Sequence, residues 1–113
     1  MKGTHLGEFE EIVLLVIAAL QQEAYGLGIK KELEEQTNRT VTISAVHAAC
    51  NRLADKGFLS AEFGKRSAKR GGKRKKIYAV TMKGQQALQN AYTLRQKLWG
   101  NIDPNSFQID LSF

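Results

Sequence analysis

The stretch TISAVHAACNRLADKG, residues 42–57, predicts one complete helix together with both of its ends. Thr42 is a residue type that caps helix N-termini. Gly57 is the type that most often follows a helix C-terminus, because it adopts a left-handed backbone without strain. Apolar residues between them recur at spacings of four and three, on one helical face: Val46, Cys50 and Leu53. We therefore expect a helix over 43–56 with one buried and one free face.

A long apolar helix is predicted at the start of the chain. The run IVLLVIAAL, residues 12–20, follows a group of acidic residues that suit the positive end of a helix dipole. A buried strand is the alternative, but Ala18, Ala19 and the glutamines after them favour a helix over 9–23. This helix is apolar nearly all round, so we expect it to be buried or shared with a partner. The acidic residues are Glu8, Glu10 and Glu11.

A second, short helix is predicted between these two. The sequence YGLG, residues 25–28, indicates a break after the first helix. Ile29 and Leu33 then lie four residues apart on one face, and a turn is expected at 37–39. The last two helices are joined by a short connection, which is the layout of a helix-turn-helix.

A β-hairpin is predicted after the helices. Residues 58–64 alternate apolar and polar side chains, and residues 77–81 are rich in β-branched and aromatic types, so both read as strands. The loop between them, KRSAKRGGKRKK at 65–76, contains Gly71 and Gly72, which let the chain reverse. The predicted fold is mainly α with a small β-hairpin: a winged helix-turn-helix followed by one more helix.

The last helix is predicted over 82–99, with Thr81 as its N-cap. It carries two apolar stripes, more than the small body before it can cover, so we expect one stripe to pack within the chain and the other to form a dimer contact. Arg95 lies between the stripes and is a candidate for pairing across the dimer. The tail 101–113 alternates apolar and polar residues, a pattern that predicts either an edge strand or a disordered segment. The stripes are Ala87, Ala91, Leu94 and Leu98, and beside them Leu88, Tyr92 and Trp99.

The positive charge of the chain is concentrated in one place. Residues 65–76 hold eight of the 17 basic residues and no acid, while the remainder holds nine basic and eleven acidic residues. A local field of this kind indicates a site for a negatively charged partner rather than general solubility.

The other bulk features exclude several classes of protein. Cys50 is the single cysteine, so no disulfide forms within the chain, and the longest apolar run, nine residues, falls short of the ~20 that span a bilayer. With no signal-peptide pattern, we expect a cytoplasmic protein without a membrane partner. No nucleophile–base set, cofactor motif or metal-ligand spacing stands out, and His5 is distant from His47, so an enzyme, a cofactor and a metal site are not expected.

Four stretches in this order resemble the PadR family of winged-helix transcription regulators: GEFEEIVLLVIAAL, AYG, TISAVHAACNRLADKGFL and GGKRKKIYAVTMKGQQAL. The resemblance covers roughly residues 6–98, and the short chain is similar to the compact subfamily in which the single helix after the wing makes the dimer. It implies a homodimer that binds an inverted-repeat operator in double-stranded DNA, usually as a repressor. It further implies a DNA-binding domain over 1–81, a dimerisation helix over 82–100 and a tail over 101–113.

Within that family, tyrosine is common where this chain has His47, and proline is common where it has Ile43, so base preference cannot be transferred. The residue types themselves suggest adenine as the target of Asn51 and guanine as the target of Arg52. Arg52 has an alternative, which is pairing with Asp55 or another acid. His47 is a polar contact whose charge responds to pH. The candidate DNA contacts on this helix are Thr42, Ser44, Ala45, His47, Ala48, Asn51 and Arg52.

The basic loop is expected to neutralise DNA phosphates or to enter the minor groove, although a solvated loop is the simpler interpretation. Its candidate contacts are Lys65, Arg66, Lys69, Arg70, Lys73, Arg74 and Lys75.

Three further questions stay open at this level. Trp99 is a candidate site for a small apolar or aromatic effector, or simply part of the interface packing. Cys50 is a redox sensor or, more in keeping with its apolar stripe, a buried inert thiol. Tyr25 and Tyr78 either touch phosphate or pack. The competing functions are RNA binding, which lacks aromatic residues among the basic ones for base stacking, and a protein-interaction adaptor.

Overall fold

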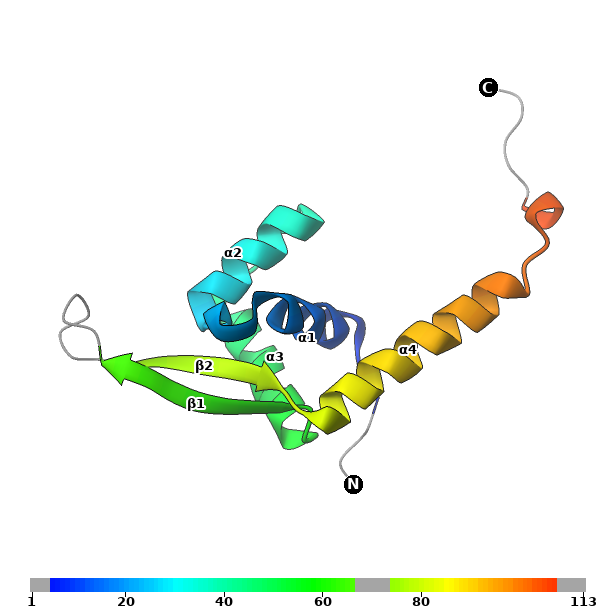
Figure 1. Cartoon of the computed structure of the whole chain (residues 1–113). Coiled ribbons are helices and arrows are strands. Elements are labelled where there is room, and N and C mark those ends of the chain that lie inside the picture. The colour runs from blue at the N-terminus through cyan, green and yellow to red at the C-terminus, as the bar shows by residue number, and fades with distance from the viewer. Residues whose placement is uncertain (1–4, 67–73, 108–113) are drawn as a thin grey trace.

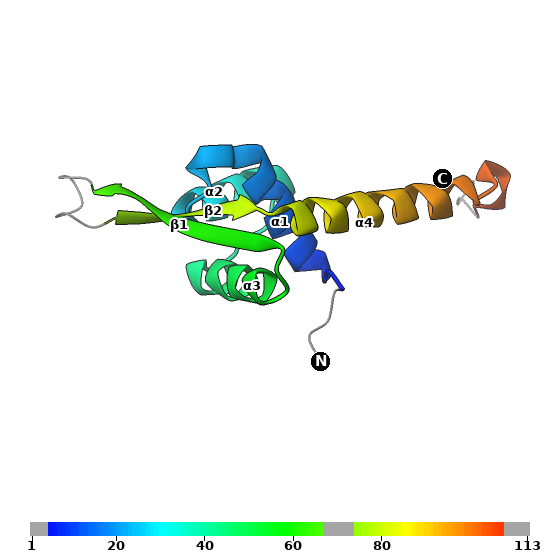
Figure 2. The ribbon, with the colours of Figure 1, turned by 60° about the horizontal axis from the view of Figure 1, so that its bottom comes forward.

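The computed structural model describes residues 5–66 and 74–107 and confirms a mainly helical chain with a single hairpin in that part. The hairpin and the last helix leave the three-helix body in opposite directions (Figures 1 and 2), so the molecule is elongated, with extents of 61 × 37 × 23 Å. The elements are α1 (Glu8–Leu20), a 3-10 turn η1 (Gln21–Glu23), α2 (Gly26–Thr37), α3 (Ile43–Asp55), β1 (Leu59–Arg66), β2 (Arg74–Val80), α4 (Met82–Gly100) and a 3-10 turn η3 (Pro104–Ser106).

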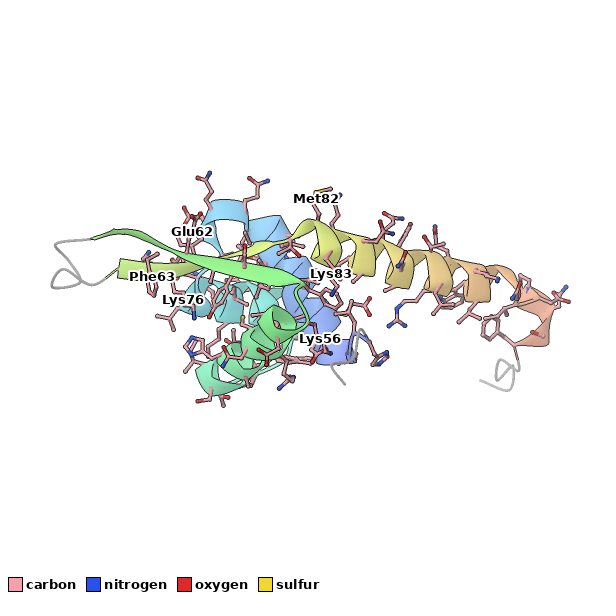
Figure 3. All side chains as sticks on the ribbon, turned by 90° about the horizontal axis from the view of Figure 1, so that it is seen from below. Lys56, Glu62, Phe63, Lys76, Met82 and Lys83 are labelled. Carbon is pink, nitrogen blue, oxygen red and sulfur yellow. The ribbon has the colours of Figure 1, made fainter. Side chains whose placement is uncertain are left out.

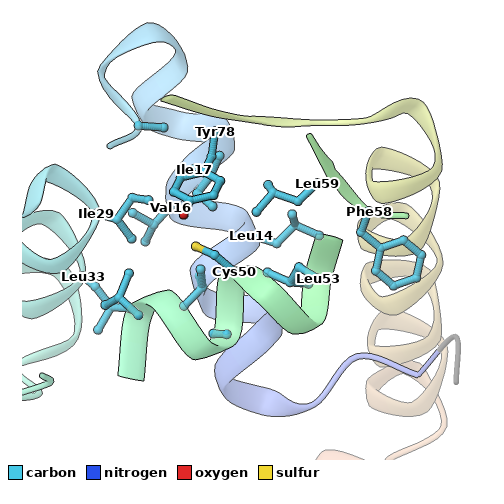
Figure 4. Close-up of a cluster of buried hydrophobic side chains, with 14 residues drawn as sticks. Leu14, Val16, Ile17, Ile29, Leu33, Cys50, Leu53, Phe58, Leu59 and Tyr78 are labelled. Carbon is cyan, nitrogen blue, oxygen red and sulfur yellow. The ribbon is translucent and has the colours of Figure 1, made fainter. Parts of the chain in front are cut away.

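The core lies between α1, α2, α3 and the base of the hairpin (Figure 4). The predicted stripe of α3 is confirmed, since Val46, Cys50 and Leu53 are completely buried. α1 is buried along most of its apolar surface, as expected, but Leu15 is 49% exposed, and whether a partner covers it stays a prediction. The remaining large core side chains are Val13, Leu14, Ile17, Ile29, Leu33, Phe58, Leu59 and Tyr78.

The predicted ends of α3 are confirmed. The Thr42 hydroxyl accepts a hydrogen bond from the Ala45 N–H at 3.0 Å, which satisfies one of the free donors of the first turn. Gly57 has a φ of +82°, and the backbone then returns through a hydrogen bond from the Phe58 N–H to the Leu53 carbonyl. Of the break predicted at 25–28, only Tyr25 lies outside a helix, because α2 begins at Gly26.

The hairpin strands are longer than the sequence pattern predicts. β1 and β2 pair antiparallel from Leu59 opposite Val80 outward to Arg66 opposite Arg74. The apolar pattern underestimates them because both faces of a projecting two-stranded ribbon meet water, so its outer residues need no apolar side chains. Part of the predicted loop 65–76 is therefore strand, and Lys69, Arg70 and Lys73 lie outside the described residues.

The last helix is anchored at its first turn. The Thr81 hydroxyl accepts from the Gly84 N–H at 3.0 Å and donates to the Gly57 carbonyl at 2.7 Å, so the predicted cap is confirmed and is tied to the end of α3. Gly84 is buried, and a Cβ there would lie 2.2 Å from the Phe58 carbonyl oxygen. Only a glycine lets α4 approach this closely.

The expectation that one complete stripe of α4 packs within the chain was wrong. Ala87, Leu88 and Ala91 are partly buried, but Leu94 and Leu98 are 56% and 55% exposed. The straight helix projects from the body, so the small body covers little of its outer part (Figure 1).

Gly84→Ala is expected to destabilise the chain strongly, by about 3 kcal/mol or more, because the new methyl group overlaps a backbone carbonyl. Gly100→Ala is the matched control in the same helix, since nothing lies within 4 Å of the added Cβ. Urea unfolding of both variants measures the difference. Equal stability of the two variants would contradict the close approach at Gly84.

Candidate nucleic-acid interface

The face of α3 opposite the core is free. Ser44, His47, Ala48, Asn51 and Arg52 are exposed, and so is the capping residue Thr42, while Ala45 is half-buried. In the view from below, α3 lies at the edge of the body, with side chains extending from its outer side (Figure 3). All seven positions predicted on this helix are therefore reachable by a large ligand.

A groove of about 420 Å³ joins this face to the hairpin. It places Lys75 and Lys76 of β2 beside residues of α3 that lie at least 24 positions earlier in the chain. The Lys75 ammonium lies 3.9 Å from the centre of the Tyr25 ring, a cation–π contact that holds the lysine at the rim. The groove is lined by Tyr25, Gly26, Leu27, Ile43, His47, Asn51, Lys75, Lys76 and Tyr78.

His47 lies against the first turn of α2. A Cβ on Gly26 would be 2.8 Å from His47 Nε2 and 3.3 Å from Ile43 Cδ1, so the imidazole occupies the space that a side chain at 26 would need. Sequence reasoning treated this glycine only as a helix breaker and missed its role. A glycine in a helical first turn has no local signal that indicates which distant side chain packs on it.

The structure separates the two tyrosines and settles the state of the thiol. Tyr78 is buried next to Cys50, whereas Tyr25 is half-buried at the groove (Figure 4). Burial raises the pKa of Cys50 to about 11, although Lys76 and the Tyr78 hydroxyl partly oppose this. The thiol is protonated at neutral pH, so the interpretation as a buried inert thiol is confirmed.

Arg52 is paired with an acid, but the acid is Glu10 of α1 rather than Asp55. Its Nε donates to Glu10 Oε2 at 2.9 Å, and Lys56 Nζ donates to Glu10 Oε1 at 2.6 Å. The Gly7 N–H also donates to this carboxylate, which is only 6% exposed. Burial by itself raises the pKa of Glu10, but the donors Lys56, Gly7 and Arg52 outweigh it and lower the pKa to about 2. The Arg52 side chain stays 51% exposed, so it can still meet a ligand.

Beyond the groove, the described part of the basic segment continues as strand. Lys65, Arg66 and Arg74 belong to β1 and β2. Within the described residues, no three histidine, cysteine or carboxylate side chains converge as metal ligands. In the same part of the chain, no helix combines the length and the apolar character that crossing a membrane requires.

Of the residues predicted for a dimer interface, five lie on the free part of α4, namely Tyr92, Leu94, Arg95, Leu98 and Trp99, whereas Ala87, Leu88 and Ala91 are partly buried. Tyr92 is 58% and Trp99 67% exposed, and the Trp99 ring is 6.2 Å from that of Phe107 after η3. Within the chain, Arg95 Nη2 donates to Glu11 Oε1 at 2.9 Å, a contact that the sequence pattern did not indicate, and pairing of Arg95 across a dimer stays a prediction. A groove of about 450 Å³ between α1 and α4 is lined by several of the same residues, among them Ala87, Ala91, Leu94 and Leu98.

The chain is similar to known transcription regulators. A model of the transcriptional regulator PadR-like family matches residues 13–90. Among solved structures, a PadR-like transcription factor from Bacteroides fragilis has a TM-score of 0.69 at 23% identity, over 81% of this chain and 84% of that one. A PadR family transcription regulator from Clostridium difficile R20291 has a TM-score of 0.64 at 19% identity, over 81% and 92% of the two chains. The PadR-like regulator from Bacillus cereus has a TM-score of 0.62 at 20% identity, over 82% and 88%. No curated protein matches the chain. At such identities the structures show the fold, which is a winged helix.

Glu10→Gln is expected to lower the free energy of unfolding by about 2 kcal/mol at neutral pH, because it removes a buried charge and leaves Lys56 and Arg52 without it. The pKa of Glu10 is about 2 in the folded chain against an ordinary 4.5. Its stabilisation is therefore complete above pH ~4.5 and is lost as the pH falls toward ~2. The stability difference between the two proteins should shrink over the same interval. Glu35→Gln, at an exposed position of α2, is the control. If the stability difference between the wild type and Glu10→Gln does not depend on pH, the ionised Glu10 carboxylate is not what stabilises the fold.

Proposed function

The chain belongs to the transcriptional regulator PadR-like family, and on this basis we propose that it binds an inverted-repeat operator in double-stranded DNA as a homodimer and represses transcription. The observation that carries the proposal is the groove that joins the free face of α3 to the basic hairpin. Along this groove, α3 offers side chains that can contact bases, and the lysines of β2 beside it offer cations for phosphates. These are the two kinds of contact that specific DNA binding needs.

In this proposal α3 enters the major groove, which is wide enough to admit an α-helix. The small residues Ala45 and Ala48 let its backbone come close to the bases. Asn51 is at the centre of the exposed face, and its amide matches the donor and acceptor pair of adenine. Arg52 uses its terminal nitrogens, because its Nε is held by Glu10.

The hairpin supplies the electrostatic part of the affinity. Segment 65–76 carries eight basic residues, and the structure shows that Lys75 sits at the junction with the reading helix. Each lysine or arginine that meets a phosphate releases condensed counterions. The hairpin extends away from the body, as the approach to the backbone or minor groove beside the α3 site requires (Figure 2).

We propose that a second copy of the chain packs against the exposed apolar side chains of α4. Its free half exposes large apolar side chains that a monomer leaves in water, which is unusual for an isolated soluble domain. Two-fold pairing buries the same patch on both chains and doubles the DNA contacts. The aromatic pair Trp99–Phe107 lies on this part of the molecule and is where a small apolar or aromatic effector would bind. The exposed apolar residues are Tyr92, Leu94, Leu98, Trp99 and Ile102.

Selection of bound duplexes from a random DNA pool at physiological salt is expected to enrich an inverted repeat. Its half-sites should lie about one helical turn apart, as two-fold related reading helices require. The selected duplex is then competed with double-stranded RNA of equal length. Retention without enrichment, or preference for the RNA, would contradict sequence-specific DNA reading.

Two substitutions are expected to separate reading from phosphate binding. Asn51→Ala should reduce the preference for the selected operator by about tenfold, because one bidentate base contact is worth ~1–3 kcal/mol of discrimination. Lys75→Ala should weaken binding to all sequences alike and lower the log–log salt slope by about one contact. Lys97→Ala, with the same loss of charge at the far end of α4, is the control. If Lys75→Ala and Lys97→Ala have the same salt slope, Lys75 does not contact a phosphate.

A further inference from the structure

The acidic residues that open α1 each bind a basic residue from a different element. Glu8 pairs with Arg39 of the connection between α2 and α3. Glu10 pairs with Arg52 and Lys56 at the end of α3. Glu11 pairs with Arg95 of α4. The first turn of α1 therefore touches both the reading helix and the helix that carries the exposed apolar surface.

The pair of Glu11 and Arg95 is the outer attachment of α4. Among the hydrogen bonds and ion pairs of residues 5–66 and 74–107, it is the one that ties α4 beyond its first turn to another helix. The other hydrogen bonds there stay within α4 or in the turn that follows it. Glu11 is largely buried, its side chain being only 16% exposed, and Arg95 reaches it from a solvent-exposed helix face at 2.9 Å. The inner attachment is Gly84, which is wedged against Phe58.

These two attachments set the direction of α4. An α-helix rises about 1.5 Å per residue, so Gly84 and Arg95 lie about 16 Å apart along the axis. A tilt of about 10° around Gly84 would move Arg95 by about 3 Å, close to the 3.4 Å between successive base pairs. In a dimer joined through α4, the angle between α4 and the body determines how far apart the two copies of α3 lie.

We propose that Glu11 and Arg95 are positioning residues, and that their ion pair selects the distance between half-sites which the dimer accepts. This inference rests on the proposed function, because it requires a dimer that reads two half-sites. It concerns spacing only, since neither residue lies on the face of α3 that meets DNA.

The test compares Glu11→Gln with Glu8→Gln, using the full chain and duplexes that carry the selected half-sites. Spacers range from about two base pairs shorter to about two longer than the preferred one. Glu8→Gln is matched, because it removes an acid from the same helical turn by the same chemistry. The hydrogen-bonded partner of Glu8 is Arg39, so Arg95 keeps its hydrogen bond to Glu11 in this variant and loses only a longer-range attraction. Wild type and Glu8→Gln should prefer one spacing. For Glu11→Gln, the ratio of the affinity for the best spacing to the affinity for the neighbouring spacings should fall by about tenfold. The affinity for a duplex with a single half-site should stay unchanged.

A double variant, Glu11→Arg with Arg95→Glu, should restore the wild-type spacing profile, which a loss of stability alone would not predict. Light scattering of each variant reports the number of chains. A two-chain Glu11→Gln with an unchanged spacing profile overturns the inference, and so does a one-chain Glu11→Gln beside a two-chain wild type, because the pair would then serve assembly. A wild type that is a single chain, or that binds no duplex, overturns the proposed function itself.

Discussion

The buried carboxylate of Glu10 is the constraint that sets the position of α3. A charge that is only 6% exposed is costly unless donors surround it, and here three donors do so: Lys56, Arg52 and the Gly7 N–H. Two of these donors belong to the last turns of α3. The apolar stripe of α3 decides which face is buried, but apolar contacts allow some sliding along the helix axis. The ionic contact removes that freedom and places the free face of α3 at one position on α1.

The same helical turn of α1 organises the rest of the molecule. Glu8 forms an ion pair with the connection before α3, and Glu11 forms one with α4. The element proposed to read DNA and the element proposed to pair two chains are therefore both attached to the first turn of α1. At the other end of α3, His47 rests on Gly26, and Lys75 rests on Tyr25. The position of α3 is therefore fixed at both of its ends: by ion pairs with Glu10 at its C-terminal end, and by close packing at its N-terminal end.

Features that depend on neighbours along the chain could be predicted from the sequence. The caps Thr42 and Thr81, the stop at Gly57 and the buried stripe of α3 were all expected, because a capping hydroxyl or a helical face is decided within a few residues. The strand lengths were underestimated, because backbone pairing in a projecting ribbon needs no apolar pattern. The acid that pairs with Arg52 was left open, and the contact of Arg95 with Glu11 was not foreseen, because one charge pattern allows many distant acids as partners.

The sequence by itself determined the order of the helices, the hairpin after them, the concentration of positive charge on that hairpin and the resemblance to a family of regulators. Periodicity and capping depend on residues a few positions apart, and composition needs no structure at all, so these features can be recognised without knowing the tertiary contacts. Only the tertiary structure decided that the acids of α1 hold α3 and α4, that a glycine of α2 makes room for His47, and that α4 leaves the body with its apolar residues uncovered. These contacts join residues from about 20 to more than 80 positions apart, and the packing of the whole core sets their distances.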